Sequence, residues 1–426
     1  MNAIIHFLEK YLQGPMAKLS QQRHLQAIRN GVVSALPFII VGSIFLIIAM
    51  PPVPATWGIA KWAAANITQI MIPYRLTMYI MTIYMTFGIG YNLAKSYKID
   101  ALAAGQLSVA AFLMTITPIA DPKLGQILPM ANLGGQGLFM GIITSFFAVE
   151  VLRFCKEKNF TIKMPEAAPP FVSRPFEALI PVVIVIGVMA LITVVFKIDL
   201  NALMMHLFAP IIKAGNTPWG IMIPIFLNGF LWAFGVHGAA VVGAIATPIW
   251  QVYVQENAAA VADGKPMPNI APETFYQWFV YIGGSGVTLG LLIAIFIVAK
   301  SKFAKSIAKL GFIPGLFNIN EPVMFGAPVV LNPLLIIPFI INPMIGGLMA
   351  YGATSLGWVG KTYVTVPWTM PAPIGAFLST GGDWRAIILV LVNLAIATVI
   401  YIPFVKMWDQ KLVQQEAGED VTEEDA

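Results

Sequence analysis

The chain has 426 residues, of which 58% are apolar and 11% charged, with a formal net charge of +5 and a mean hydropathy of +0.79. Soluble globular domains carry about 25% charged residues, so this composition excludes an ordinary cytosolic enzyme, a disordered chain and a nucleic-acid-binding protein. A membrane-spanning helix needs roughly 20 apolar residues, which leaves room for about ten such helices. The single cysteine, Cys155, excludes an internal disulfide and a cysteine-based metal cluster. We therefore expect an all-α polytopic membrane protein.

Uniformly apolar segments predict five membrane crossings in the first half of the chain, residues 1–197. Ile4, Leu8 and Leu12 recur at helical spacing and predict a short interfacial helix before the first crossing. The apolar run at 31–50 exceeds the roughly 7–15 residues of a signal-peptide core, so it predicts a crossing and not a cleavable signal. The other four crossings are expected near residues 75–94, 101–118, 134–152 and 176–196.

The regular pattern ends near residue 197. Residues 198–215 predict an amphipathic linker helix on the membrane surface, with Leu203, Leu207 and Ile211 on one side. Further crossings are expected near 218–234, 273–299, 329–351 and 384–405, and glycine or proline interrupts the stretches at 235–250, 311–328 and 361–382. Unpaired backbone groups cannot face lipid, so the interrupted stretches predict re-entrant hairpins that line a cavity. We expect residues 216–410 to hold the substrate.

Basic residues predict that both chain termini are cytoplasmic, because cytoplasmic loops retain Lys and Arg. Those that fall on one side of the predicted membrane are Lys10, Lys18, Arg23, Arg29, Lys95, Lys98, Arg153, Lys156, Lys158, Lys163, Arg174, Lys300, Lys302, Lys305, Lys309, Lys406 and Lys411. Residues 411–426 predict an acidic, solvated cytoplasmic tail.

A polar segment, Asn318-Ile319-Asn320-Glu321-Pro322, interrupts the apolar stretch 311–330. A carboxylate at membrane depth costs several kcal/mol unless it is paired, so Glu321 is a candidate functional residue. Pro322 favours an extended backbone at Glu321. An acid flanked by two amides offers the donors and acceptors that a sugar requires. The alternative is a structural hydrogen-bond network that holds the tip of a hairpin.

His237 follows an apolar span that contains Trp232, and it lies between two glycines, where the backbone can approach a ligand closely. Histidine has an unperturbed pKa near neutral pH, so it can accept a proton from a hydroxyl group or form a hydrogen bond with it. The alternative is a histidine that only donates a hydrogen bond within the bundle.

Gly283-Gly284-Ser285-Gly286 lies halfway along the predicted crossing at 273–299. A phosphate-binding loop needs a strand before it, and apolar helix is expected on both sides here. Two interpretations stay open, namely close helix packing through small residues and a local unwinding that exposes Gly284 and Ser285 to substrate.

Trp232 and Trp368 lie in the interrupted half of the chain. Aromatic rings with a polar edge pack against the apolar face of a sugar ring while its hydroxyls form hydrogen bonds. Trp368 has a proline on either side, Pro367 and Pro371, which predicts non-helical backbone. The alternative is the interfacial aromatic belt of membrane proteins.

The sequence contains no Walker motif, no HExxH, no GxSxG and no Cys/His metal set, so we expect neither a cofactor nor a metal. The leading hypothesis is a sugar permease. One alternative is an ion-coupled secondary transporter that uses Glu321 as its proton or sodium site. Another is an intramembrane enzyme acting on lipid-linked sugars, for which no close pair of carboxylates is visible.

These motifs, together with Gly235-Val236-His237-Gly238, resemble the membrane-embedded C component (EIIC) of enzyme II of the bacterial phosphoenolpyruvate-dependent phosphotransferase system, in the lactose, cellobiose and chitobiose branch. The resemblance covers nearly the whole chain. It implies a ten-span homodimer in the bacterial cell membrane, with the first five spans at the dimer interface. It also implies that a mobile domain carries the sugar across by an elevator-like displacement.

The resemblance further implies roles for individual residues. Glu321 would bind sugar hydroxyls close to the one that is phosphorylated, His237 would be its partner in binding and catalysis, and Trp368 would be the stacking platform. The substrate would be a β-linked disaccharide, and the phosphoryl donor a phosphocysteine on a B component. Some members carry that component fused at the C-terminus, whereas this sequence stops after a short acidic tail, so a separate B component is expected.

Overall fold

The computed structural model describes residues 21–417 apart from 52, 163–169, 328, 330 and 331. Most of this part is helical, with one short two-stranded hairpin, so the expected all-α fold is confirmed. The helix expected before residue 20 and the tail beyond residue 417 lie outside the described residues. Residues 411–417 of the expected tail continue the last helix.

The first half contains α3 (Arg23–Ala49), α4 (Gly58–Ala65), α5 (Ile67–Arg75), η2 (Met78–Ile80), α6 (Met81–Ser96), α7 (Ala101–Leu113), β1 (Ile119–Asp121), β2 (Gly125–Ile127), η3 (Ala131–Leu133), η4 (Gly135–Gly137), α8 (Leu138–Glu157), α9 (Pro170–Ala190) and η5 (Leu191–Val195). The second half contains α10 (Leu200–Gly215), α11 (Pro218–Ala233), α12 (Gly238–Ala262), α13 (Glu273–Phe275), η6 (Tyr276–Val280), η7 (Ser285–Val287), α14 (Thr288–Val298), α15 (Lys302–Leu316), α16 (Glu321–Gly326), α17 (Pro333–Ser355), α18 (Ala372–Ser379) and α19 (Arg385–Ala417).

Six helical segments of the described chain are long and apolar enough to cross a membrane. They are Arg23–Ala49, Gly135–Glu157, Pro175–Val195, Glu273–Val298, Leu334–Ser355 and Trp384–Ala417. Shorter apolar helices, α7, α10 and α11, supplement them. The expected crossings at 75–94 and 101–118 therefore correspond to helices shorter than a full span, α6 and α7.

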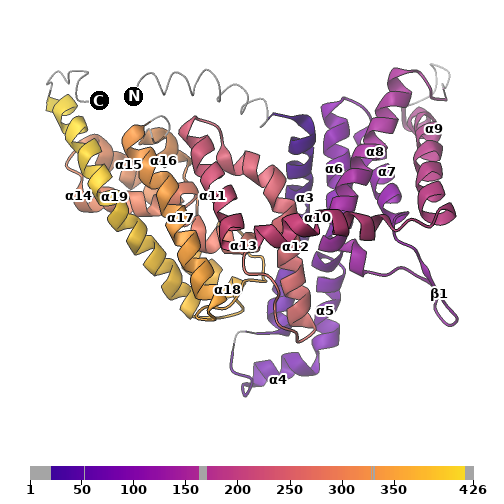
Figure 1. Cartoon of the computed structure of the whole chain (residues 1–426), viewed down its shortest axis with the longest axis horizontal. Coiled ribbons are helices and arrows are strands. Elements are labelled where there is room, and N and C mark those ends of the chain that lie inside the picture. The colour runs from indigo at the N-terminus through magenta and orange to yellow at the C-terminus, as the bar shows by residue number, and fades with distance from the viewer. Residues whose placement is uncertain (1–20, 52, 163–169, 328, 330–331, 418–426) are drawn as a thin grey trace.

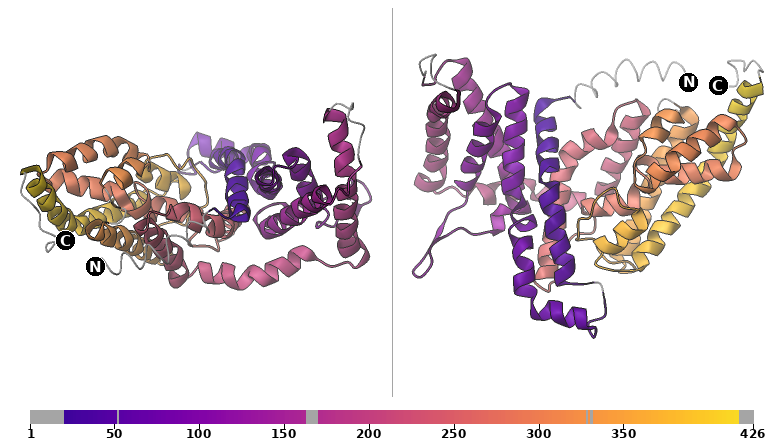
Figure 2. Two further views of the ribbon diagram at one scale, coloured as in Figure 1. Left: turned by 90° about the horizontal axis from the view of Figure 1, so that it is seen from above. Right: turned by 180° about the vertical axis from the view of Figure 1, so that it is seen from behind.

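The helices form two lobes (Figure 1). The first lobe holds α6 to α9, the second holds α14 to α19, and α3 meets α12 between them. Seen from above, α10 runs along one edge and joins the lobes (Figure 2). The β1–β2 hairpin is antiparallel, pairs Asp121 with Gly125, and projects from the first lobe.

Glycine allows α3 and α6 to cross closely in the first lobe. A Cβ atom on Gly31 would lie 2.5 Å from the backbone nitrogen of Ile89, and one on Gly88 would lie 2.9 Å from the carbonyl oxygen of Gly31. Small residues let membrane helices approach backbone to backbone, where van der Waals packing stabilises them. The α3–α6 pair is thus a rigid element of this lobe.

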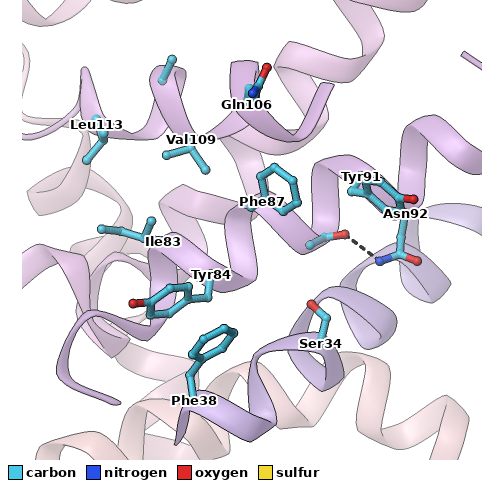
Figure 3. Close-up of a pocket in the computed structure, with 12 residues that line it drawn as sticks. Ser34, Phe38, Ile83, Tyr84, Phe87, Tyr91, Asn92, Gln106, Val109 and Leu113 are labelled. Atoms are coloured by element: carbon cyan, nitrogen blue, oxygen red, sulfur yellow. Dashed lines mark hydrogen bonds between the residues drawn. The ribbon is translucent and has the colours of Figure 1, made fainter. Parts of the chain in front are cut away.

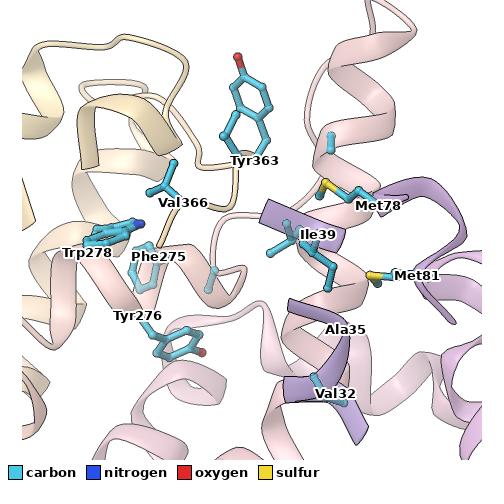
Figure 4. Packing of buried hydrophobic residues seen from close by; sticks show 14 of the residues in the cluster. Val32, Ala35, Ile39, Met78, Met81, Phe275, Tyr276, Trp278, Tyr363 and Val366 are labelled. Carbon is cyan, nitrogen blue, oxygen red and sulfur yellow. The ribbon is translucent and has the colours of Figure 1, made fainter. Parts of the chain in front are cut away.

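One buried apolar cluster connects the lobes (Figure 4). It contains Ile39 of α3 and Met81 of α6 together with Phe275 of α13 and Trp278 of η6, all almost fully buried. The backbone nitrogen of Thr365 also donates to the Ser43 hydroxyl at 3.2 Å. The second lobe therefore packs against α3 through side chains and backbone alike.

The stretch at 235–250 differs from the expected re-entrant hairpin. Gly235, with φ 73°, forms part of the turn between α11 and α12, and the remainder lies within continuous helix α12. Pro248 is inside that helix. Membrane helices tolerate proline because neighbouring groups satisfy the freed carbonyl. The glycine and proline residues of this stretch therefore predicted a longer interruption of helix than the structure has.

Candidate functional site

Three interruptions of helical backbone meet in the second lobe. The first is 281–287, which breaks the predicted crossing at 273–299 between η6 and α14. The second is the turn between α15 and α16, and the third is the non-helical segment that ends at α18. The expected breaks at 311–328 and 361–382 are therefore confirmed as interruptions of helix.

Asn318 holds the three interruptions together. Its Oδ1 atom accepts from the backbone nitrogen of Gly283 at 2.9 Å. Its Nδ2 atom donates to the carbonyl oxygens of Trp368 at 2.8 Å and Met370 at 2.9 Å. Asn318 has φ 62°, in the left-handed region that asparagine tolerates better than most residues. Its amide group is thus fully engaged with backbone.

Asn320 makes a second link between the α15–α16 turn and the unwound segment. Its Nδ2 atom donates to the carbonyl oxygen of Ser285 at 3.1 Å. The Ser285 hydroxyl accepts from Asn228 Nδ2, also at 3.1 Å. Asn318, Asn320 and Ser285 are all at least 92% buried, so these polar groups satisfy one another within the lobe.

The segment 283–287 is unwound, and its glycines also pack closely, since a Cβ atom on Gly286 would lie 2.0 Å from the ring of Phe339. Gly283, Gly284 and Gly286 all have positive φ, and so does the β-branched Val287 at 56°. A Cβ atom on Gly284 would lie 2.6 Å from Cγ of Asn320. Glycine is required there both for backbone conformation and for the close approach of Asn320. Strained backbone of this kind clusters at functional sites.

Glu321 differs from its two amide neighbours because its side chain is exposed. It begins α16, where the positive end of the helix dipole favours a carboxylate. Within the described part of the chain its carboxylate forms no hydrogen bond or ion pair. Glu321 is therefore free to accept hydrogen bonds from a ligand.

His237 caps the N-terminus of α12, where its Nδ1 atom accepts from the backbone nitrogen of Ala240 at 3.2 Å. The side chain is otherwise exposed, and Glu321 lies near enough for its charge to act on the imidazole. A neutral imidazole that accepts at Nδ1 carries its proton at Nε2. His237 can thus donate a hydrogen bond through Nε2, on the side of the ring away from Ala240.

The two tryptophans of interest differ in exposure. Trp368 is 50% exposed, whereas Trp232 is 3% exposed and packs with its ring centroid 4.5 Å from that of His237. The Trp232 indole nitrogen has no hydrogen-bond partner in the described structure. Trp368 is thus available as a stacking surface, and Trp232 supports the His237 ring.

The base of the third interruption is fixed by Asp383. Its carboxylate accepts from the backbone nitrogen of Gly360 at 2.7 Å and pairs with Arg385 at 2.8 Å. Burial disfavours the charged form, but the hydrogen bonds from Arg385 and Gly360 outweigh it and hold the pKa of Asp383 below its usual value. The non-helical segment before α18 is thereby anchored at its first residue, Gly360, at the end away from Asn318.

Sequence reasoning missed Asn228, which orients Ser285. A signal was present, since Asn228 is an isolated amide within the apolar helix α11. The turn that carries His237 also packs on this residue, because a Cβ atom on Gly238 would lie 2.1 Å from the Asn228 carbonyl oxygen. Asn228 therefore connects the His237 turn with the unwound segment.

A cavity of about 810 Å³ lies elsewhere, between α3, α6 and α7 (Figure 3). Phe38, Tyr84 and Phe87 contribute to an almost wholly apolar lining. Phe38 and Tyr84 stack with ring centroids 4.4 Å apart. An apolar surface of this kind suits lipid or another helix and offers little to a polar solute.

Comparison with known proteins gives consistent matches. Residues 29–343 match the family described as phosphotransferase system, EIIC. The chain is 38% identical to the cellobiose-specific EIIC component of Geobacillus stearothermophilus, over 99% of this chain and 98% of the relative. It is 37% identical to the lichenan permease IIC component of Bacillus subtilis (strain 168), over 98% and 96% of the two chains.

A solved structure is also similar. The transporter ChbC, the IIC component from the N,N'-diacetylchitobiose-specific phosphotransferase system, matches with a TM-score of 0.90 and 39% identity. The match covers 97% of this chain and 100% of that one. The overall fold described above is thus shared with a solved membrane transporter.

Proposed function

The chain belongs to the EIIC family of the bacterial phosphotransferase system, and we propose that it selects a β-linked disaccharide of the cellobiose or diacetylchitobiose type. As a member of this family, the chain is a sugar permease of the bacterial cytoplasmic membrane. The β-linked substrate is supported by the printed names of the cellobiose, lichenan and diacetylchitobiose relatives.

The observation that carries the proposal is an unpaired carboxylate beside converging helix interruptions. A sugar that leaves water loses a hydrogen bond at each hydroxyl, and each must be replaced. Glu321 accepts from two hydroxyls, and His237 Nε2 donates to a third. Trp368 stacks on the apolar face of one ring.

The buried amides have a different part in this site. Asn318 and Asn320 position the hairpin turns, since their side-chain amides form hydrogen bonds with backbone groups. Gly284 and Ser285 bring unwound backbone close to the ligand, and Trp232 orients His237. These residues shape the site that Glu321, His237 and Trp368 line.

His237 acts as a hydrogen-bond donor and not as a general base. Its Nδ1 lone pair is engaged with Ala240, so the neutral ring has no free acceptor nitrogen. The phosphoryl group arrives from the phosphocysteine of a separate B component: the S–P bond breaks and leaves a cysteine thiolate on that component. Glu321 orients the acceptor hydroxyl and takes up its proton as the new O–P bond forms. Phosphorylation adds a charge of about −1.5 to −2, which prevents return through an apolar path.

Movement across the membrane is proposed as an elevator-like displacement of residues 216–410, the sugar-carrying domain, against residues 1–197. A homodimer through the first half fits the exposed apolar surface of Pro175–Val195, which spans α9 and η5. Only 17% of the most apolar part of this segment is buried. The proposed orientation places both termini in the cytoplasm, which the distribution of Lys and Arg supports.

The test uses purified chain in proteoliposomes with radiolabelled cellobiose and diacetylchitobiose. Retained sugar is expected only when the phosphorylated B component is inside, with maltose as the α-linked control. Accumulation driven by a proton or sodium gradient without the B component would instead establish the ion-coupled alternative, in which Glu321 is the coupling site.

A further inference from the structure

We propose that a cavity between α5 and the C-terminal end of α12 is a second carbohydrate site, separate from the Glu321 site, which receives a disaccharide on the external face. The cavity has a volume of about 360 Å³, within the range of small-molecule pockets. The inference rests on the proposed function, since it takes the same class of ligand.

The cavity is remote from the first site. Asp263, which lines it, is the residue that follows α12, whereas His237 is the residue that precedes α12. A helix of 25 residues spans up to about 37 Å at 1.5 Å per residue. The cavity therefore lies at the other end of α12 from His237, toward α4 (Figure 1).

The key observation is a buried hydroxyl without a partner. Tyr74 lines the cavity with a side chain that is 1% exposed, and its hydroxyl has no hydrogen-bond partner among the described residues. Asp263 and Arg75, the two charged residues of the same lining, lie near enough for their charges to act on this hydroxyl. A buried polar group left unpaired is costly, and a ligand hydroxyl would satisfy it.

The lining fits a neutral polyol better than an ion. Arg75 and Asp263 have opposite charges, so neither an anion nor a cation is favoured by both. Asp263 also pairs with Lys265 through Oδ2 at 3.1 Å, an exposed pair at the rim that is readily exchanged for other partners. Donors and acceptors on facing walls match sugar hydroxyls.

Aromatic surface completes the match. Tyr74 and Tyr79 both line the cavity with ring centroids 6.0 Å apart and planes at 60°. The partly exposed Tyr79 ring can bind the apolar face of a sugar, and the buried Tyr74 ring packs behind it. Met71 and Met130 supply adaptable apolar contacts.

The site also bridges the two lobes. Tyr74 and Tyr79 belong to the first half, whereas Asp263 follows α12 in the second. The Gln255 Nε2 atom of α12 donates to the Tyr79 carbonyl oxygen at 2.9 Å, which fixes the walls relative to each other. A bound disaccharide would contact both halves.

A local probe tests the cavity without relying on the Glu321 site. Thr68 is exposed and lines the cavity, whereas neighbouring Gln69 is exposed outside this lining. Thr68→Cys and Gln69→Cys are made separately with Cys155→Ala in the full-length chain, and the rate of maleimide labelling is measured with cellobiose, with diacetylchitobiose or with sodium sulfate. At least one disaccharide is expected to slow labelling at position 68 and not at position 69.

Tyr74→Phe removes only the hydroxyl and is expected to raise the sugar concentration needed for protection about two- to tenfold. Tyr91→Phe is the matched control. The same protection is expected with Glu321→Gln, and retention of sugar in proteoliposomes with the phosphorylated B component separately decides the proposed function. No protection by sugar, protection only when Glu321 is present, insensitivity to Tyr74→Phe, or protection by sulfate alone would each overturn the second site.

Discussion

The side-chain amide of Asn318 donates to the carbonyl oxygen of Trp368 at 2.8 Å and thereby joins two helix interruptions that lie 50 residues apart in the chain. The same side chain accepts from Gly283, so one residue sets the relative position of all three segments. The functional consequence is that Glu321 and Trp368 are held at a fixed separation even though neither lies within a long helix.

Asn318→Gly tests this relationship because glycine retains the left-handed backbone but loses three hydrogen bonds. Each such bond contributes about 1 kcal/mol, so a loss of about 2–4 kcal/mol in stability is expected. The readout is the thermal unfolding midpoint in detergent. Asn159→Gly, at an exposed turn with φ 56°, is the matched control. An unchanged midpoint for Asn318→Gly would show that the segments are held by other contacts.

Gly284→Ala should damage the unwound segment. Alanine would be strained at φ 102°, and its Cβ would collide with Asn320, at a cost of about 1–3 kcal/mol for the backbone alone. Sugar binding and thermal stability should both fall. Gly187→Ala is the control, because nothing lies within 4 Å of its added Cβ. Equal behaviour of the two variants would mean that the segment adjusts freely.

The interruptions at 311–328 and 361–382 were predictable because glycine, proline and polar residues stand out within otherwise apolar segments. The same signal was misleading at 235–250, where α12 continues through Pro248. Local composition identifies residues that permit a break. Whether the backbone breaks depends on tertiary partners, such as Asn318 for Gly283, that lie far away in the chain.

Candidate site residues were predictable to a similar degree. Glu321, His237 and Trp368 stood out by residue type and have exposed side chains in the structure. The engagement of Asn318 and Asn320 with backbone was one of two open interpretations, and the role of Asn228 was missed. Hydrogen bonds between distant segments depend on packing geometry, which no local pattern specifies.

Glu321→Gln should weaken sugar binding about 10- to 100-fold, because hydrogen bonds to a charged group contribute about 1.5–3 kcal/mol. Stability should be unchanged, since the carboxylate has no partner in the described structure. Calorimetry with disaccharide and thermal unfolding give the two measurements. Glu177→Gln is the matched control at an exposed acid. Full affinity in the Glu321 variant would remove this residue from the site.

His237→Gln should retain part of the phosphorylation rate, because the glutamine amide still donates a hydrogen bond. A general base would give a different result, with sugar binding intact and turnover abolished. Binding by calorimetry is compared with phosphorylation by the B component. His206→Gln, an exposed position on α10, is the control. Intact binding with no turnover would assign the base role to His237 and contradict the donor role.

Trp368→Ala should weaken sugar affinity by about 1–2 kcal/mol, a five- to thirtyfold effect, on the scale of a stacked aromatic contact. The thermal midpoint should stay constant, because Asn318 binds the backbone carbonyl of Trp368 and the indole is 50% exposed. Trp368→Phe should recover most of the affinity. Trp358→Ala is the matched control, since Trp358 is 67% exposed outside the site. A lower midpoint with unchanged affinity would assign the indole to packing and leave the sugar without a stacking surface at this position.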